Sequence, residues 1–466
     1  MGTFRRHSHR SWARTLTRAS ALLIPIALLL SMPVSTASAG SPTPSLALSF
    51  GPAHPQPANF WGMNIEDDNE TVPNPVTALS QTPTTLLVYP AGNLTERTDY
   101  STNTVYEVGS HKQAIVTIQD FIADCKAISC TAVMGLPMEI NSPSTDAMEA
   151  KYVVDTLGFH PAFFVYGNEP AHWYCFDISW AALAAGHRCN TGNTTIPAFA
   201  NETEAAIQAV TAALGTHTPS AMCLGGSGKQ GPGNETNWIH GLEANAYDRV
   251  ACAAYAMHVK PAHSGTVAPT LANFYASLTG PQALPADYQN ASKATDGKPL
   301  YMTEVGWSTR SSVFAPVFTG TWATNVLESA LVVQAMQNRI PAMGYWAWNE
   351  GGGLHAYPRD TFWSIYTKLF PDLRHTWMAS QYHGQQGIFA EATRNGPHGS
   401  SWTLILVSTN ITKSFHVSLA GSGFPLSGCG ILDTWTSSGE TTRSLCDLGG
   451  GFTAPAQSVI MLTTKG

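Results

Sequence analysis

The stretch "FFVYGNEP" (Phe163–Pro170) joins the pattern of a buried strand to a carboxylate. Its first residues are apolar or aromatic without alternation, which is typical of a parallel strand covered on both faces. The run stops at Asn168 and Glu169, and Pro170 favours extended backbone at the residue before it. We therefore expect Glu169 to stand at the carboxyl end of a buried strand.

Seven other runs of this kind occur along the chain, each followed by a longer segment. They are residues 59–65, 84–90, 131–137, 220–226, 251–258, 299–304 and 343–349. Helix signals lie between them: in "NETEAAIQAVTAALG", Asn201 is expected to cap a helix, Glu204 to complete a capping box and Gly215 to end it. Strand and helix thus alternate eight times, which predicts an α/β fold, a (β/α)8 TIM barrel.

The sequence pattern changes near residue 370. From there on, short strand-like runs alternate with turns rich in Gly, Pro, Ser and Asn, and no helix signals occur. This predicts an antiparallel β-sandwich over residues 371–466, after a catalytic barrel over 53–370. Residues 40–52 are expected to form a linker and a strand that joins the sandwich.

The first 39 residues have the pattern of a secretory signal peptide. An arginine-rich start precedes the apolar run Ala21–Leu30, and "STASAG" offers a cleavage site after Ala39. The apolar run is too short to cross a bilayer, although an uncleaved anchor is the alternative. We expect a secreted, extracellular protein that is free of the membrane after cleavage.

Composition agrees with an extracellular protein. Charged residues make up 12% of the chain, about half the usual share, and the net charge of −7 offers no basic face to nucleic acid. An even number of cysteines in a secreted chain predicts disulfides. Neighbours along the chain are the simplest pairs: Cys125–Cys130, Cys175–Cys189, Cys223–Cys252 and Cys429–Cys446. Glycosylation sequons begin at Asn69, Asn93, Asn193, Asn201, Asn234, Asn290 and Asn410.

Two glutamates stand at ends of predicted barrel strands. Glu169 ends the fourth run and Glu304 ends the seventh. Barrel enzymes carry their active sites at this edge, and two carboxyl groups facing one another are what glycoside hydrolysis requires. Glu139 and Glu350 follow the third and eighth runs and are alternatives, but Glu139 lacks the preceding Asn and following Pro.

The Asn168–Glu169 pair after strand four and Glu304 after strand seven resemble clan A of the glycoside hydrolases, the retaining (β/α)8 enzymes. The resemblance implies that Glu169 is the acid/base, Glu304 the nucleophile and Asn168 a contact of the sugar 2-hydroxyl. The appended sandwich and the "YGNEP" segment are similar to family 79, the β-glucuronidase and heparanase group. "TEVGWS" instead resembles the nucleophile segment of family 17 β-1,3-glucanases.

Further substrate contacts are expected from this resemblance and from position along the chain. Trp346 in the eighth run would lie under the reactive sugar, unless it packs in the core. His258 at the end of the sixth run would lie near the nucleophile, with Tyr255 as the alternative. Tyr89 after the second run would line the site. In the loop "NEGGGLHAYPRD", Gly352 and Tyr357 would read a uronate carboxylate, with Gly351 and Gly353 beside them.

No cofactor or metal site is expected, because the histidines show no metal-ligand spacing and "GGSGKQGPG" lacks the Ser or Thr of a phosphate loop. The sequence predicts a retaining β-glycosidase acting on an oligo- or polysaccharide, with a β-glucuronide as the favoured sugar. The alternatives are an endo-β-glucanase on a neutral polysaccharide and a non-catalytic carbohydrate-binding protein on the same barrel. The sequence carries no signal of an oligomeric state.

Overall fold

A computed structural model describes most of the chain from residue 43 to residue 464. The described residues are 43–65, 79–90, 95–107, 110–168, 196–217, 221–225, 252–259, 267–280, 283–293, 295, 297–307, 314–318, 320–345, 365–367, 377–382, 387–396 and 398–464. The predicted signal peptide and several strand-to-helix loops lie outside these residues. Among the described helices, none is both long and apolar enough to cross a membrane.

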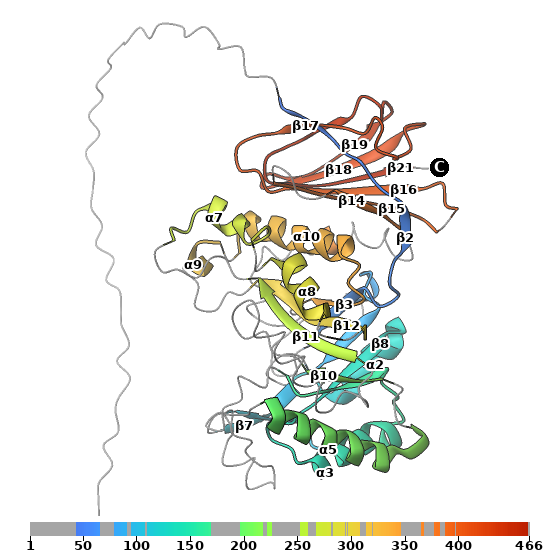
Figure 1. The fold of residues 1–466 in the computed structure, drawn as a ribbon, viewed down its shortest axis with the longest axis vertical. Coiled ribbons are helices and arrows are strands. Elements are labelled where there is room, and N and C mark those ends of the chain that lie inside the picture. The colour runs from blue at the N-terminus through green and yellow to red at the C-terminus, as the bar shows by residue number, and fades with distance from the viewer. Residues whose placement is uncertain are drawn as a thin grey trace, which may run out of the picture. The chain divides into compact units, whose positions relative to one another are not determined.

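Eight parallel strands close into a barrel (Figure 1). In chain order they are β3 (Trp61–Asn64), β4 (Leu86–Tyr89), β8 (Thr131–Leu136), β9 (Phe163–Tyr166), β10 (Ala221–Gly225), β11 (Cys252–Val259), β12 (Leu300–Trp307) and β13 (Met343–Tyr345). Each lies within or overlaps one of the eight predicted runs, and β13 pairs with β3 to complete the ring. The predicted parallel strands are therefore confirmed, because unbroken apolar runs are buried on both faces.

Helices with four or more described α-helical residues follow five of the strands. They are α2 (Ile118–Ile128), α3 (Pro143–Lys151) continued by the π-helix η2 (Tyr152–Thr156), α5 (Ile196–Leu214) continued by the 3-10 helix η5 (Gly215–His217), α7 (Leu271–Ala276), α8 (Leu284–Lys293), α9 (Ala315–Phe318) and α10 (Trp322–Gln337).

The expected cap at Asn201 is wrong, because α5 begins at Ile196 and Asn201 is an exposed residue within it. Phe199 and Thr203 are fully buried and extend the buried stripe of Ile207 and Val210 toward the N-terminus. Packing of this longer buried helix face, rather than the capping motif at Asn201, therefore determines where the helix begins.

A small antiparallel sheet follows β4 and was not predicted. It contains β5 (Thr98–Asp99), β6 (Thr104–Glu107) and β7 (Ser110–Gln113). The segment leading into it is seated on the barrel: a Cβ at Gly135 of β8 would lie 2.2 Å from the methyl carbon of Thr95. The Tyr100 hydroxyl also donates to the Gly135 carbonyl. Glycine at position 135 thus lets residues 95–100 rest directly on a barrel strand.

The C-terminal region forms two sheets around a second apolar core. The larger sheet contains β2 (Ala53–Pro55), β14 (Trp377–Tyr382), β15 (Ile388–Arg394), β16 (Trp402–Ser408), β18 (Gly430–Thr436), β19 (Gly439–Leu445) and β21 (Ser458–Thr464). The smaller contains β1 (Ser45–Ala47), β17 (Phe415–Ser418) and β20 (Phe452–Ala454).

The two N-terminal strands both belong to these sheets. As expected, the strand near residue 46 joins the sandwich, but β1 pairs with β17 in parallel, so the sandwich is not wholly antiparallel. The pairing of β2 with β14 also moves residues 53–55, which we expected in the barrel, into the larger sheet. Barrel helix α10 contacts this sheet, where Gln337 Nε2 donates to the Ala390 carbonyl at 2.9 Å.

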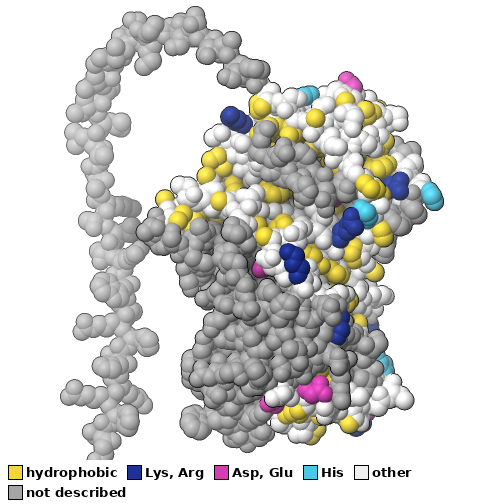
Figure 2. Space-filling view, viewed as in Figure 1, with side chains coloured by type: hydrophobic (Ala, Val, Ile, Leu, Met, Phe, Trp, Pro, Cys, Tyr) yellow, Lys and Arg dark blue, Asp and Glu magenta, His cyan; other side chains and the backbone are white. Residues whose placement is uncertain are grey.

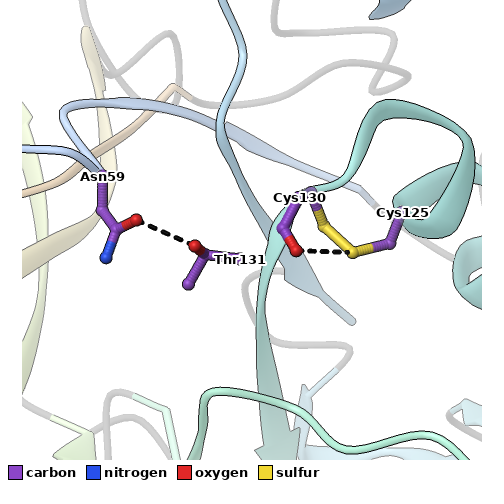
Figure 3. The surroundings of a disulfide bond; sticks show 4 residues. All are labelled: Asn59, Cys125, Cys130 and Thr131. Atoms are coloured by element: carbon purple, nitrogen blue, oxygen red, sulfur yellow. Dashed lines mark hydrogen bonds between the residues drawn. A yellow bond between two sulfur atoms is a disulfide. The ribbon is translucent and has the colours of Figure 1, made fainter.

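Two of the predicted disulfides are present. Cys125–Cys130 links the end of α2 to the residue before β8, and beside it the Thr131 hydroxyl donates to Asn59 Oδ1 at 2.9 Å (Figure 3). Cys429–Cys446 joins the start of β18 to the end of β19. Cys223 and Cys252 are direct register partners on β10 and β11, but their side chains, like Cys175 and Cys189, lie outside the described residues.

A β-bulge interrupts β12 immediately before Glu304. Tyr255 pairs with Met302 and the next residue, Ala256, pairs with Glu304, so Thr303 is an extra residue. The Thr303 carbonyl closely approaches the neighbouring strand, since a Cβ at Gly344 would lie 2.3 Å from that oxygen. Bulges of this kind re-aim the side chains that follow them.

Gly344→Ala tests this close approach. The added methyl group would overlap a backbone carbonyl, so we expect the free energy of unfolding to fall by about 1–3 kcal/mol, measured by chemical denaturation. Gly280→Ala is the matched control, because a Cβ there would meet its nearest neighbour, the Ala276 carbonyl, at 3.6 Å. Equal stability of the two variants would contradict the close approach.

Candidate active site

A small cavity of about 20 Å³ lies at the carboxyl ends of the barrel strands, large enough for one water molecule. Five strands, or the residues directly after them, supply the lining that the structure describes, apart from Thr95. Its described lining is Asn64, Val88, Pro90, Thr95, Gly135, Val165, Gly167, Asn168, Thr303 and Glu304. This is the edge at which the sequence predicted chemistry.

Glu304 is buried in this cavity, with 5% of its surface exposed. Thr303 and Glu304 both line the cavity, although consecutive side chains of a regular strand alternate between faces. The bulge at Thr303 accounts for this exception. His258 pairs in register with Gly306 near the same end of the sheet, while its side chain lies outside the described residues.

Asn168 also lies at the cavity, although it is far from Glu304 in the sequence. It follows β9, lines the cavity and donates its backbone N–H to the Glu96 carboxyl. The structure thus brings Asn168 and Glu304 to one cavity, as predicted. Glu169 is the next residue and lies outside the described residues, so the separation of the two glutamates stays a prediction.

Two more carboxyl groups lie at this end of the barrel. Glu96 and Glu139 are 1% and 2% exposed, and Glu96 accepts the backbone N–H of Glu139 at 2.7 Å. Glu139 was an alternative in the sequence, whereas Glu96 was missed because it follows no strand-like run. Both oxygens of Glu96 are engaged by backbone N–H groups, one from each of two neighbouring strand ends.

Asn64 at the end of β3 was also missed. Its buried side-chain amide donates to the carbonyl oxygens of Thr303 at 2.8 Å and Gly344 at 3.0 Å. The amide therefore holds the bulge that precedes Glu304. In the sequence, the only indication of this role was that Asn64 is a polar residue near the end of an apolar run.

Tyr89 does not line the cavity, which corrects its predicted role. It is fully buried, its ring stacks on Phe121 of α2, and its hydroxyl donates to the Val116 carbonyl at 2.8 Å. Its neighbours Val88 and Pro90 line the cavity, so strand alternation directs Tyr89 to the opposite face.

The remaining predicted site residues lie outside the described part of the chain. These are Trp346, Glu350, Gly351, Gly352, Gly353 and Tyr357. Within the described residues, no group of three or more His, Cys, Asp or Glu side chains is arranged to hold a metal ion.

The fold is shared with solved glycoside hydrolase structures. AbfB, a family 51 α-L-arabinofuranosidase from Bifidobacterium longum, matches with a TM-score of 0.66 and 15% identity over 90% of this chain and 99% of that one. Cel44A, a family 44 endoglucanase from Clostridium thermocellum, gives 0.63 and 11% over the same shares. A family 44 xyloglucanase from Paenibacillus polymyxa gives 0.63 and 11% over 91% and 100%.

At these identities the structural similarity shows a shared fold and does not assign a family. None of these three structures comes from family 79 or family 17, the two families that the sequence resembled. A scan of the sequence against protein-family models finds no match, and a search of curated proteins finds none.

Buried carboxyl groups with raised pKa values occur around the barrel. Burial raises the pKa of Glu96 well above its usual range, with the charge of Glu139 adding to the effect. Burial acts in the same way on the pKa of Glu149 in α3, where Asp146 adds to it. It also raises the pKa of Asp124 to about 6.

From these raised pKa values we predict that the protein is more stable at mildly acidic pH than at neutral or basic pH. Each keeps its proton in the folded state at pH values where the unfolded chain has released it, so the free energy of unfolding falls as pH rises above about 4.5. We expect a higher melting temperature at pH 5 than at pH 8. Glu149→Gln should make this decline shallower, because it removes one of the buried carboxyl groups. Stability that is flat or rises over this range would contradict the assignment.

Proposed function

We propose that this protein is a retaining glycoside hydrolase, with Glu304 as nucleophile and Glu169 as acid/base. The observation that carries the proposal is that Glu304 of β12 and Asn168, which follows β9, line one cavity at the carboxyl ends of the barrel strands although they are far apart in the sequence. Catalytic groups of such barrels are placed at this edge.

The two carboxyl groups have complementary tasks. Glu304 attacks the anomeric carbon while Glu169 gives its proton to the departing glycosidic oxygen, which leaves a glycosyl ester on Glu304. Glu169 then takes a proton from water as that water attacks the same anomeric carbon. The bond between this carbon and the Glu304 oxygen breaks, which releases the sugar and restores the Glu304 carboxylate and the protonated Glu169. This double displacement requires carboxyl groups about 5–5.5 Å apart. The shared fold of family 51 and family 44 enzymes supports the assignment.

Secretion is part of the proposal. The first 39 residues have the signal-peptide pattern, and the described residues contain two disulfides, which persist in oxidising compartments. Charged side chains are few and separated on the described part of the face shown in Figure 2, in keeping with the 12% charged composition.

We infer a neutral sugar rather than a uronide, in contrast to the sequence-based preference. The described lining of the cavity contains no Lys, Arg or His, while Glu304 lies in it and Glu96 and Glu139 lie nearby. A uronate carboxylate would meet Glu304, the proposed nucleophile, without a described cationic partner. Like charges brought together at a binding surface cost several kcal/mol.

Substitution of the two glutamates tests the mechanism. Glu304→Gln should abolish hydrolysis of every aryl glycoside, because no nucleophile remains. Glu169→Ala should retain reaction with 2,4-dinitrophenyl glycosides, whose leaving group needs little protonation, and lose it with phenyl glycosides. Azide should restore turnover of Glu169→Ala by replacing water in the second step.

Initial rates and identification of the glycosyl azide are the measurements. Equal loss in both variants without azide rescue would contradict the separate roles. Wild-type protein that binds oligosaccharides but hydrolyses none of them would favour the non-catalytic alternative.

Sugar preference follows from the charge of the cavity. We expect the kcat/KM for the best of 4-nitrophenyl β-glucoside, β-xyloside and α-L-arabinofuranoside to exceed that for 4-nitrophenyl β-glucuronide by at least about tenfold, which corresponds to about 1.4 kcal/mol. A preference for the glucuronide would overturn the neutral-sugar inference and leave the two catalytic roles in place.

A further inference from the structure

Glu96 is a buried carboxyl group that the proposed reaction does not use. Its Oε1 accepts the backbone N–H of Asn168, and its Oε2 accepts that of Glu139 at 2.7 Å. Asn168 follows β9 and Glu139 follows β8, so one side chain ties together the ends of two adjacent barrel strands. Asn168 is covalently joined to Glu169.

The segment that carries Glu96 is itself fixed on the barrel. The Thr95 hydroxyl donates to the Pro90 carbonyl at 2.6 Å, and the Thr95 methyl rests on Gly135 of β8. The Tyr100 hydroxyl donates to the Gly135 carbonyl. Glu96 therefore belongs to a segment that contacts on both sides of it, at Thr95 and at Tyr100, fix on the barrel. Its own side chain is only 1% exposed.

We propose that Glu96 is a positioning residue that fixes the backbone carrying the acid/base Glu169. The proposal rests on the proposed function, in which Glu169 protonates the leaving group. We assign Glu96 no proton transfer, because it is not among the described residues that line the cavity and both of its oxygens accept backbone N–H groups. It acts through the residue next to Glu169.

The effect should be specific to proton transfer. A misplacement of about 1 Å in a catalytic group costs on the order of 100-fold in rate. The strand that carries Glu304 is held by different residues, since Asn64 donates to the Thr303 carbonyl and Gly344 admits the bulge. Loss of the Glu96 side chain should therefore impair proton donation by Glu169 while leaving the nucleophile Glu304 in place.

Glu96→Gln is the test, because glutamine keeps the shape but offers one acceptor oxygen and one NH2 group in place of two acceptors. With the best sugar of the aryl-glycoside panel, we expect kcat/KM to fall by about 100-fold on the phenyl glycoside. On the 2,4-dinitrophenyl glycoside it should fall by less than about threefold, since little protonation is needed.

Glu149→Gln is the matched control. Glu149 is another glutamate with little exposure, 3%, but it lies in α3 and does not line the cavity. Its substitution should change kcat/KM by the same factor on both glycosides. Thr95→Ser is a milder second variant that keeps the hydroxyl and removes the methyl seated on Gly135, and it should show the selectivity of Glu96→Gln in smaller measure.

The outcomes separate the two proposals. Wild-type protein without hydrolysis, or Glu169→Ala without leaving-group selectivity, would overturn the proposed function and this inference with it. When both behave as expected, an equal loss on the two glycosides in Glu96→Gln would overturn the role of Glu96 alone. If Glu96→Gln does not fold, Thr95→Ser decides: a selective loss supports the role, and an equal loss or no loss overturns it.

Discussion

The side-chain amide of Asn64 holds together the edge on which the proposed chemistry depends. It lies where β3 meets β13 to close the barrel, and it donates to carbonyl groups of β12 and β13. A bulge leaves ladder groups without their strand partners, and a buried carbonyl without a donor would be costly. Asn64 supplies that donor to Thr303, so barrel closure and the direction of Glu304 depend on one amide.

The other side of the cavity is held in a related way. There the polar groups are backbone N–H groups just after β8 and β9, and the side chain that accepts from both of them is the buried carboxyl group of Glu96. Asn64 comes from a barrel strand, whereas Glu96 comes from the segment before the small sheet. Each proposed catalytic glutamate thus adjoins backbone that a buried polar side chain from another part of the chain fixes in place.

The sequence predicted the strands well and the supporting contacts poorly. Unbroken apolar runs located all eight barrel strands, because burial on both faces is a local property of the sequence. Glu96 sits in a polar stretch that resembles a surface loop, and its partner Asn168 is 72 residues away. Tyr89 was misplaced because the run does not show which of the two strand faces points into the cavity. Such contacts follow from closure of the barrel and have no local signature.

The choice of a carboxyl group at position 96 has a physical reason. Two N–H groups converge on it, and a carboxyl presents two acceptor oxygens, whereas a glutamine would turn an NH2 group toward one of the donors. Burial makes the charged form unfavourable and raises the pKa of Glu96. A protonated carboxyl still has lone pairs on both oxygens, which the NH2 group of a glutamine lacks, so the preference for a carboxyl group at position 96 holds in either form.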